Sequence, residues 1–115
     1  MDMQLNIVSS DGAVSRLQVT GQITQGALAS QPEPVGELLG EGAYARRVTL
    51  DLSEATFIDS TGLGWLLQCN KHFREAGGML VIHSVPPVIL DVVKVMRLDQ
   101  VLKIVEDEAA AADAL

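Results

Sequence analysis

Two short aliphatic runs with a helical pattern between them constrain the fold of this chain more than any other feature. The runs cover residues 47–52 and 79–83. Runs of this length and composition predict strands that are buried on both faces, as in parallel sheets covered by helices. Residues 62–76 between them carry one apolar stripe of a helix, and Gly77-Gly78 predicts where that helix ends. The stripe consists of Leu63, Leu66, Leu67, Asn70 and Phe73.

The flanking segments extend this alternation. Residues 4–9 and 14–20 alternate in polarity around the turn Ser10-Asp11-Gly12, which predicts a β-hairpin with one buried face. Further expected elements are a short helix at 34–39, an extended piece at 56–58, a helix after Pro86-Pro87, a strand at 102–105 and a terminal helix at 106–115. The buried side of the helix after Pro87 is expected to consist of Val88, Leu90, Val92, Val93 and Met96.

The order of these elements predicts an α/β fold. A hairpin followed by alternating helices and strands favours a small, mixed, mostly parallel sheet with helices packed on it. With 115 residues, 48% of them apolar, the chain is expected to form one domain over residues 1–115, with residues 107–115 fraying. Only 3% of the residues are aromatic, so the core must be aliphatic.

The charge balance limits the classes of partner. Acidic residues outnumber basic ones by 15 to 8, giving a formal charge of −7. This balance argues against nucleic acid and against an anionic membrane as partners. Neither a signal peptide nor a membrane-spanning stretch is recognisable, and Cys69 is the single cysteine. We therefore expect a protein of the reducing cytoplasm.

The stretch F-I-D-S-T-G-L-G, residues 57–64, lies where functional loops of such sheets are found, after a strand and before a helix. A dinucleotide-binding loop does not fit, because Leu67 stands where the third glycine belongs. A nucleophile elbow lacks its first glycine, at Ile58. Cys69 and His72 have no evident third metal ligand, and His83 lies in an apolar strand. No cofactor is predicted.

Two interpretations of Asp59 and Ser60 remain. In the first, one of these side chains simply caps the following helix. In the second, Ser60 is a phosphorylation switch, because the unpaired N–H groups at a helix N-terminus tolerate a phosphoserine dianion without unfolding. The same dianion in an interface would repel a partner that is arranged for a neutral hydroxyl.

The segment V-T-L-D-L-S-E-A-T-F-I-D-S-T-G-L-G, residues 48–64, resembles the signature of STAS domains. These domains are the anti-sigma factor antagonists of bacterial partner-switching pathways. Gly77-Gly78, the strand at 79–82, the prolines at 86 and 87, and Leu98 with Val101 also fit, so the resemblance covers residues 45–106.

The resemblance implies a STAS-type fold and a regulatory binding function without enzymatic activity. It implies that the partner is an anti-sigma factor that is also a serine kinase. This kinase phosphorylates Ser60, or Thr61 less often, and a serine phosphatase resets the domain. The residues that it implies for partner binding, together with those expected nearby, are Thr24, Asp59, Ser60, Thr61, Gly62, Leu63 and Trp65.

The N-terminal half departs from the family pattern. The family has an acid shortly after the glycine that ends the second strand, and Thr24 stands near that place here. The helix that usually follows is interrupted by prolines and glycines. Trp65 lies off the apolar stripe and is either an exposed interface anchor or a cover for the sheet edge. The alternative function is a STAS scaffold or transporter-associated subunit that is never phosphorylated.

Overall fold

A five-stranded sheet in the order β1-β2-β3-β4-β5 forms the centre of the molecule. The computed structural model describes residues 2–12 and 14–115. The strands are β1 (Gln4–Asp11), β2 (Val14–Ile23), β3 (Arg47–Ile58), β4 (Met79–His83) and β5 (Ile104–Val105). The pair β1–β2 is antiparallel and the other three pairs are parallel, so the predicted hairpin and mostly parallel sheet are confirmed.

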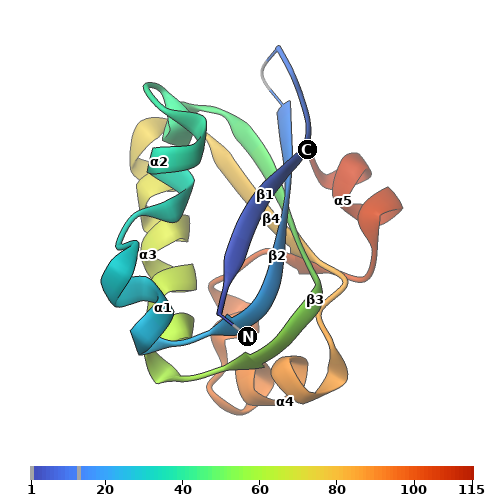
Figure 1. The fold of residues 1–115 in the computed structure, drawn as a ribbon. Coiled ribbons are helices and arrows are strands. Elements are labelled where there is room, and N and C mark those ends of the chain that lie inside the picture. The colour runs from blue at the N-terminus through green and yellow to red at the C-terminus, as the bar shows by residue number, and fades with distance from the viewer. Residues whose placement is uncertain (1, 13) are drawn as a thin grey trace.

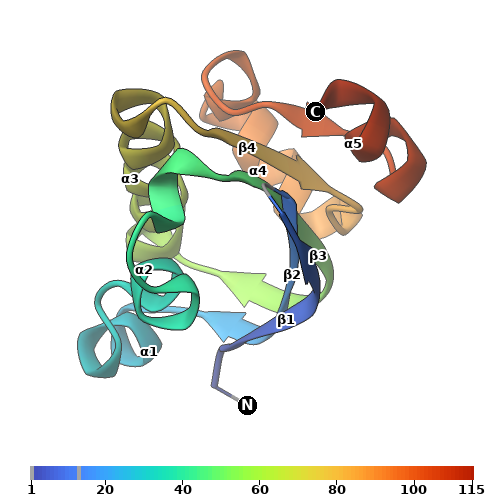
Figure 2. The ribbon, with the colours of Figure 1, turned by 90° about the horizontal axis from the view of Figure 1, so that it is seen from above.

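Helices cover both faces of this sheet (Figures 1 and 2). One face carries α1 (Gln25–Ser30), α2 (Pro34–Leu39) and α3 (Ser60–Ala76). On the opposite face, α5 (Glu108–Ala114) packs against β3 and β4, while α4 (Pro87–Val95) lies at the lower end of the sheet in Figure 1. Two 3-10 turns, Ala43–Ala45 and Leu98–Gln100, complete the described elements.

The core lies mainly between the sheet and α3. Alternate positions of β2 and β3 face it, and Leu17 stands opposite Leu50 in the register of these strands. The largest side chains that are fully buried are Phe73, Leu17, Ile23, Leu50, Leu52, Leu66, Ile82, Ile89, Val19, Val35, Val48 and Val81. Nearly all are aliphatic, as the composition predicts.

The ends of α3 follow the local sequence signals. Gly77 has φ 84° and ψ 9°, the left-handed conformation that terminates helices. The N–H of Gly78 donates to the carbonyl of Phe73 at 2.8 Å, which satisfies one carbonyl of the last turn. The helix starts at Ser60, two residues before the predicted start at Gly62, because Asp59 rather than a later residue caps it.

Several predicted boundaries were wrong. The piece expected at 56–58 is the end of β3, which runs on because its last residues pair with β2, Ile58 opposite Ile23. Helix α1 was not predicted. The last strand is two residues long instead of four, since only Ile104 and Val105 pair with β4.

The buried side expected for α4 was also largely wrong. Ile89 and Val93 face the core, whereas Val88 and Met96 are 72% and 58% exposed. The helix contacts only the end of the sheet, so a narrower strip of its surface is covered. Residues 108–114 form a helix, as expected, and Ala111 in it is fully buried.

Candidate functional site

Asp59 caps α3 directly after β3 ends. Its backbone is extended, with φ −102° and ψ −177°, and its Oδ1 accepts a hydrogen bond from the N–H of Gly62 at 2.8 Å. This is the geometry of an N-cap, in which a side-chain oxygen satisfies one of the free N–H groups of the first turn. The capping interpretation of the sequence is therefore confirmed for Asp59.

The second carboxylate oxygen of Asp59 reaches another helix. Its Oδ2 accepts from the backbone N–H of Gln25, the first residue of α1, at 2.9 Å. The N–H of Asp59 donates to the carbonyl of Ile23 at 3.2 Å. We call this arrangement the Asp59 bridge: one carboxylate that accepts from the N-terminal ends of α1 and α3. Both bonds favour the charged form, so the N–H groups of Gln25 and then Gly62 hold the pKa of Asp59 below its ordinary value.

Ser60 and Thr61 are the first two residues of α3, and both are exposed. Neither hydroxyl forms a hydrogen bond with another residue in the described part of the chain. Ser60 therefore presents its hydroxyl to solvent at the N-terminal end of a helix of 17 residues, where the helix dipole is positive. This position is accessible to a second protein, which a phosphoacceptor requires.

Gly62 and Leu63 do not lie on the surface, contrary to their expected contact with a partner. Leu63 is 6% exposed and belongs to the core cluster. A Cβ at Gly62 would collide with the carbonyl oxygen of Ile23 and lie 2.6 Å from Cγ1 of Ile58. Gly62 thus allows α3 to pack against the sheet and is not available to a partner. A Cβ at Gly64 would meet nothing within 4 Å.

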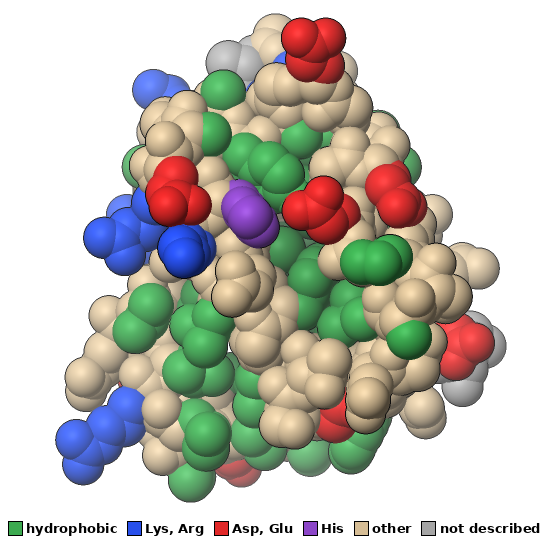
Figure 3. Space-filling view, turned by 90° about the vertical axis from the view of Figure 1, so that its left-hand side faces the viewer, with side chains coloured by type: hydrophobic (Ala, Val, Ile, Leu, Met, Phe, Trp, Pro, Cys, Tyr) green, Lys and Arg blue, Asp and Glu red, His purple; other side chains and the backbone are tan. Residues whose placement is uncertain are grey.

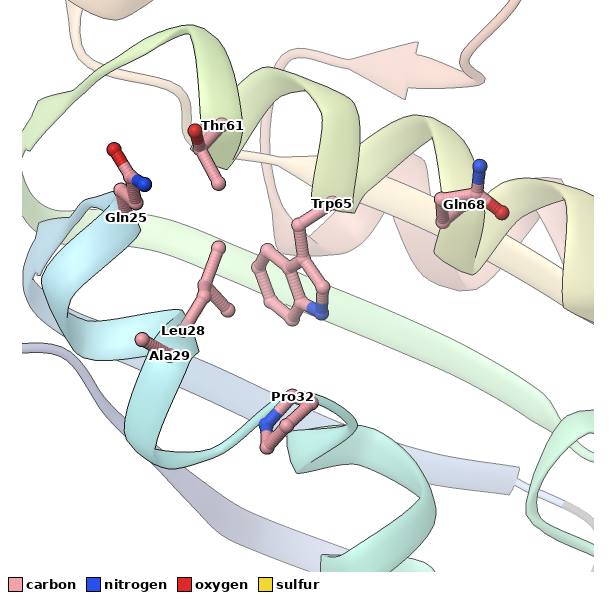
Figure 4. Close-up of a pocket in the computed structure, with 7 residues that line it drawn as sticks. All are labelled: Gln25, Leu28, Ala29, Pro32, Thr61, Trp65 and Gln68. Carbon is pink, nitrogen blue, oxygen red and sulfur yellow. The ribbon is translucent and has the colours of Figure 1, made fainter.

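Trp65 is buried, so of its two interpretations the exposed interface anchor is excluded. The residue is 7% exposed, and its ring points from α3 toward α1 and Pro32 (Figure 4). Together with Leu28 and Pro32 it lines a pocket of about 330 Å³, whose rim includes Gln25 and Thr61. The pocket reaches Thr61, the residue after Ser60, and the residues that α1 contributes to it could not be predicted because that helix was missed.

The face formed by α1, α2 and α3 is shown in Figure 3. In this view hydrophobic side chains gather in the lower part, and charged groups are more frequent above them. Thr24 lies at the start of α1, half-buried, and its Oγ1 accepts from the N–H of Ala27 at 3.4 Å. Its observed role is therefore to cap α1.

Cys69 and His72, which were considered for metal or nucleophilic chemistry, both lie near Glu33. Burial, and next the charge of Glu33, raises the pKa of the Cys69 thiol to about 12. The imidazole of His72 lies 3.9 Å from the carboxylate of Glu33. Among residues 2–12 and 14–115, no three His, Cys, Asp or Glu side chains are grouped to hold a metal ion. Within the same residues, no helix combines the length and apolar character needed to cross a bilayer.

Comparison with known proteins identifies the family. A family model described as "Mlab, STAS domain" matches residues 7–106. The chain belongs to the STAS domain family. The match covers most of the chain, from the hairpin to the residue after β5.

Solved structures have the same STAS fold. A protein from Thermotoga maritima assigned as an anti-sigma factor antagonist is 23% identical, with a TM-score of 0.77 over 97% of this chain and 92% of that one. An anti-sigma factor antagonist from Mycobacterium paratuberculosis is 20% identical, with a TM-score of 0.77 over 98% and 93%. The Bacillus cell fate determinant SpoIIAA in its phosphorylated form is 18% identical, with a TM-score of 0.68 over 97% of each chain. At these identities the likeness establishes the fold.

Proposed function

We propose that this STAS domain is an anti-sigma factor antagonist switched at Ser60. In its unmodified form it binds an anti-sigma factor that is also a serine kinase, and so releases a sigma factor. The kinase transfers the γ-phosphoryl group of ATP to Oγ of Ser60, the hydroxyl loses its proton, and ADP leaves. The phosphorylated domain dissociates, and a serine phosphatase restores the hydroxyl.

The observation that carries this proposal is the position of Ser60. It is the exposed first residue of α3, directly after the Asp59 cap. A phosphoryl group at this place faces the free N–H groups of the first helical turn and the positive end of the helix dipole, so the fold can accept it. SpoIIAA, which has the same fold, has been solved in a phosphorylated form.

The surface around Ser60 explains how one phosphoryl group could release a partner. The Asp59 carboxylate is adjacent, and the nearby pocket is lined mainly by apolar groups and amides. A partner that docks here meets the Asp59 carboxylate and otherwise mainly neutral groups, and a new dianion would have to be desolvated without a counter-charge. Weakening a complex by about 10³ requires roughly 4 kcal/mol, which an unpaired charge in an interface can supply.

The proposed role is that of a substrate and binding module of the cytoplasm, without catalysis of its own. Its expected contacts with the kinase are Ser60, Thr61 and the rim of the Trp65 pocket. Thr24 and Asp59 support these residues from beneath by capping α1 and α3.

Phosphorylation by the cognate kinase tests the proposal. We expect ATP and the kinase to add one phosphoryl group to the wild type and to Thr61→Ala, and none to Ser60→Ala. Intact-mass spectrometry measures the number of groups, and peptide mapping locates them. Both substituted positions are exposed residues of the same helical turn, so a general effect on folding should change both variants alike. Equal labelling of wild type and Ser60→Ala contradicts the assignment.

The family description favours a second candidate function. It names Mlab and not an anti-sigma factor antagonist. A STAS subunit that binds its partner through the same surface, as a scaffold or within a transport system, would need no phosphorylation. In that case Ser60→Ala retains full partner binding, and no kinase acts on the wild type.

A further inference from the structure

The second face of the sheet, opposite α1, α2 and α3, carries polar side chains where the first face carries the core. In the strand register, Arg16 of β2 stands beside Thr49 of β3. Two residues further along, three neighbouring strands place polar side chains side by side: Gln18, Asp51 and His83. Cross-strand neighbours on one face are within contact distance, so these residues form two adjacent polar rows.

Three charged groups around these rows have no ionic partner. The only ion pair within 4 Å in the described part of the chain joins His72 and Glu33, on the far side of the sheet. Within that part of the chain, the guanidinium of Arg16 and the carboxylates of Asp51 and Glu108 therefore lack a counter-charge, although they line one pocket. Arg16 donates to Oγ of Ser9 at 3.4 Å; it is half-buried, like Asp51, and Glu108 is exposed. Oδ2 of Asp51 accepts from Nε2 of Gln18 at 3.3 Å and Oδ1 accepts from the N–H of Ser53 at 2.8 Å, which fixes that carboxylate without neutralising it.

A buried hydroxyl in the same pocket also lacks a partner. Thr49 is 2% exposed, and its Oγ1 forms no hydrogen bond with any residue of the described chain. Beside it, Nδ1 of the buried His83 shares a hydrogen bond of 2.8 Å with Oγ of Ser84, which leaves Nε2 as the remaining polar atom of the ring. Ser84 adopts φ 57°, a costly conformation for serine, at the residue that orients this histidine.

The pocket is small. Its volume is about 180 Å³, and residues of β1, β2, β3, β4 and the first turn of α5 line it. A cavity of about 150 Å³ holds one benzene molecule, so this pocket admits a molecule of similar size and no nucleotide. We propose that it binds a small zwitterion with both a carboxylate and an ammonium group, such as a free amino acid.

The lining matches both charges of such a ligand. A guanidinium binds a carboxylate through two parallel hydrogen bonds, and Arg16 is the cation of the pocket. An ammonium group donates three hydrogen bonds, and Asp51 and Glu108 supply the acceptors. A third polar group of the ligand would pair with Thr49 once the ligand displaces the side chains that screen its Oγ1 from solvent, because an unpartnered buried hydroxyl gains most from a new hydrogen bond.

The test uses the ¹⁵N-labelled full chain and L-serine, which joins the two charges to one hydroxyl. We expect L-serine to shift the backbone amide signals of the second-face residues of β2, β3 and β4 in a saturable way. Sodium acetate and ethanolamine, which each carry one of the two charges, should bind at least about tenfold more weakly, because each leaves one charged side of the pocket unpaired. Signals from the Ser60 end of α3 should not move, which separates this site from the proposed phosphorylation surface.

Three variants make the test specific. Arg16→Gln should weaken L-serine binding at least about tenfold, whereas Arg74→Gln, an exposed arginine on α3, should not change it. Thr49→Val should also weaken binding but leave the melting temperature unchanged or higher, because it removes a hydroxyl that the protein does not satisfy. If the pocket holds only water, L-serine causes no saturable shifts of the amide signals, and this result overturns the proposal. Equal binding by Arg16→Gln and Arg74→Gln, or equal binding of acetate and L-serine, also overturns it.

Discussion

Gly62 and Gly64 lie in the same turn of α3, but only one of them faces the sheet. At Gly62 a methyl group would overlap the carbonyl of Ile23 and the side chain of Ile58, and at Gly64 it would enter open space. The same substitution should therefore have opposite effects at the two positions. This pair distinguishes a glycine needed for packing from one that is merely present in the D-S-T-G-L-G motif.

We expect Gly62→Ala to lower the free energy of unfolding by about 1–3 kcal/mol, because the extra methyl forces α3 away from β2 and β3. Gly64→Ala should raise it by up to about 1 kcal/mol, since alanine is the better helix former. Urea denaturation followed by circular dichroism measures both. Equal effects of the two variants would show that the approach of α3 to the sheet is not limited by Gly62.

The Asp59 bridge has a defined pH dependence. The pKa of Asp59 is lower in the folded protein than its ordinary value of 3.8, first because of the Gln25 N–H and then that of Gly62. A carboxyl whose pKa is lowered on folding stabilises the protein above the unfolded pKa, and this contribution disappears as the pH falls through the folded pKa. We expect Asp59→Asn to be less stable than wild type at pH 7, with the difference shrinking below pH 4. Urea denaturation across this pH range measures it. A difference that is independent of pH would mean that shape, and not charge, supports the bridge.

At the scale of elements, the sequence predicts best those whose stability is local. Helix α3 has its own apolar stripe, its Asp59 cap and its Gly77 stop, and all three are readable in one stretch. Helix α1 has six residues and includes Gly26, and its first N–H is satisfied by Asp59, which lies 34 positions along the chain. No local pattern encodes such a bond. The sequence left the exposure of Trp65 open for the same reason, because the residues that cover it belong to α1 and its following loop.

Two substitutions in helix α5 test whether the C-terminal residues stay packed on the sheet or fray. Ala111 is fully buried, whereas the next residue, Ala112, is exposed. We expect Ala111→Glu to lower the free energy of unfolding by about 1–3 kcal/mol, because a carboxylate must be buried or the helix released. Ala112→Glu should change it by less than about 0.5 kcal/mol. Chemical denaturation compares them, and indistinguishable variants would show that residues 107–115 fray in solution.

At the scale of the whole molecule, the fold class and the central strands were predictable and the accessible surface was not. A strand such as β4 is recognisable because it is a continuous apolar run, which is buried on both faces of the sheet. Exposure depends on distant segments: Leu63 belongs to the core, and Val88 faces solvent although it lies in an apolar run. In the predicted set for partner binding, only Ser60 and Thr61 are exposed, with Asp59 and Thr24 half-buried as caps.

The proposed switch makes a prediction at this scale. Replacing Ser60 by Asp adds a negative charge near the positive end of the α3 dipole, so the melting temperature should stay close to that of the wild type. The same variant should bind the kinase partner much more weakly, because the charge lies in the proposed interface. Differential scanning calorimetry and isothermal titration calorimetry measure the two effects separately. A large loss of thermal stability would instead assign Ser60 a role within the fold.

The Asp59 bridge gives two helices a common foundation. Their first turns are encoded in separate parts of the chain, yet one side chain sets the position of both. A partner that binds across the first turns of both helices therefore contacts one continuous surface. The shape of that surface is maintained by a side chain that the partner need not contact. Substitutions at this residue will alter recognition on the α1 side and on the α3 side together.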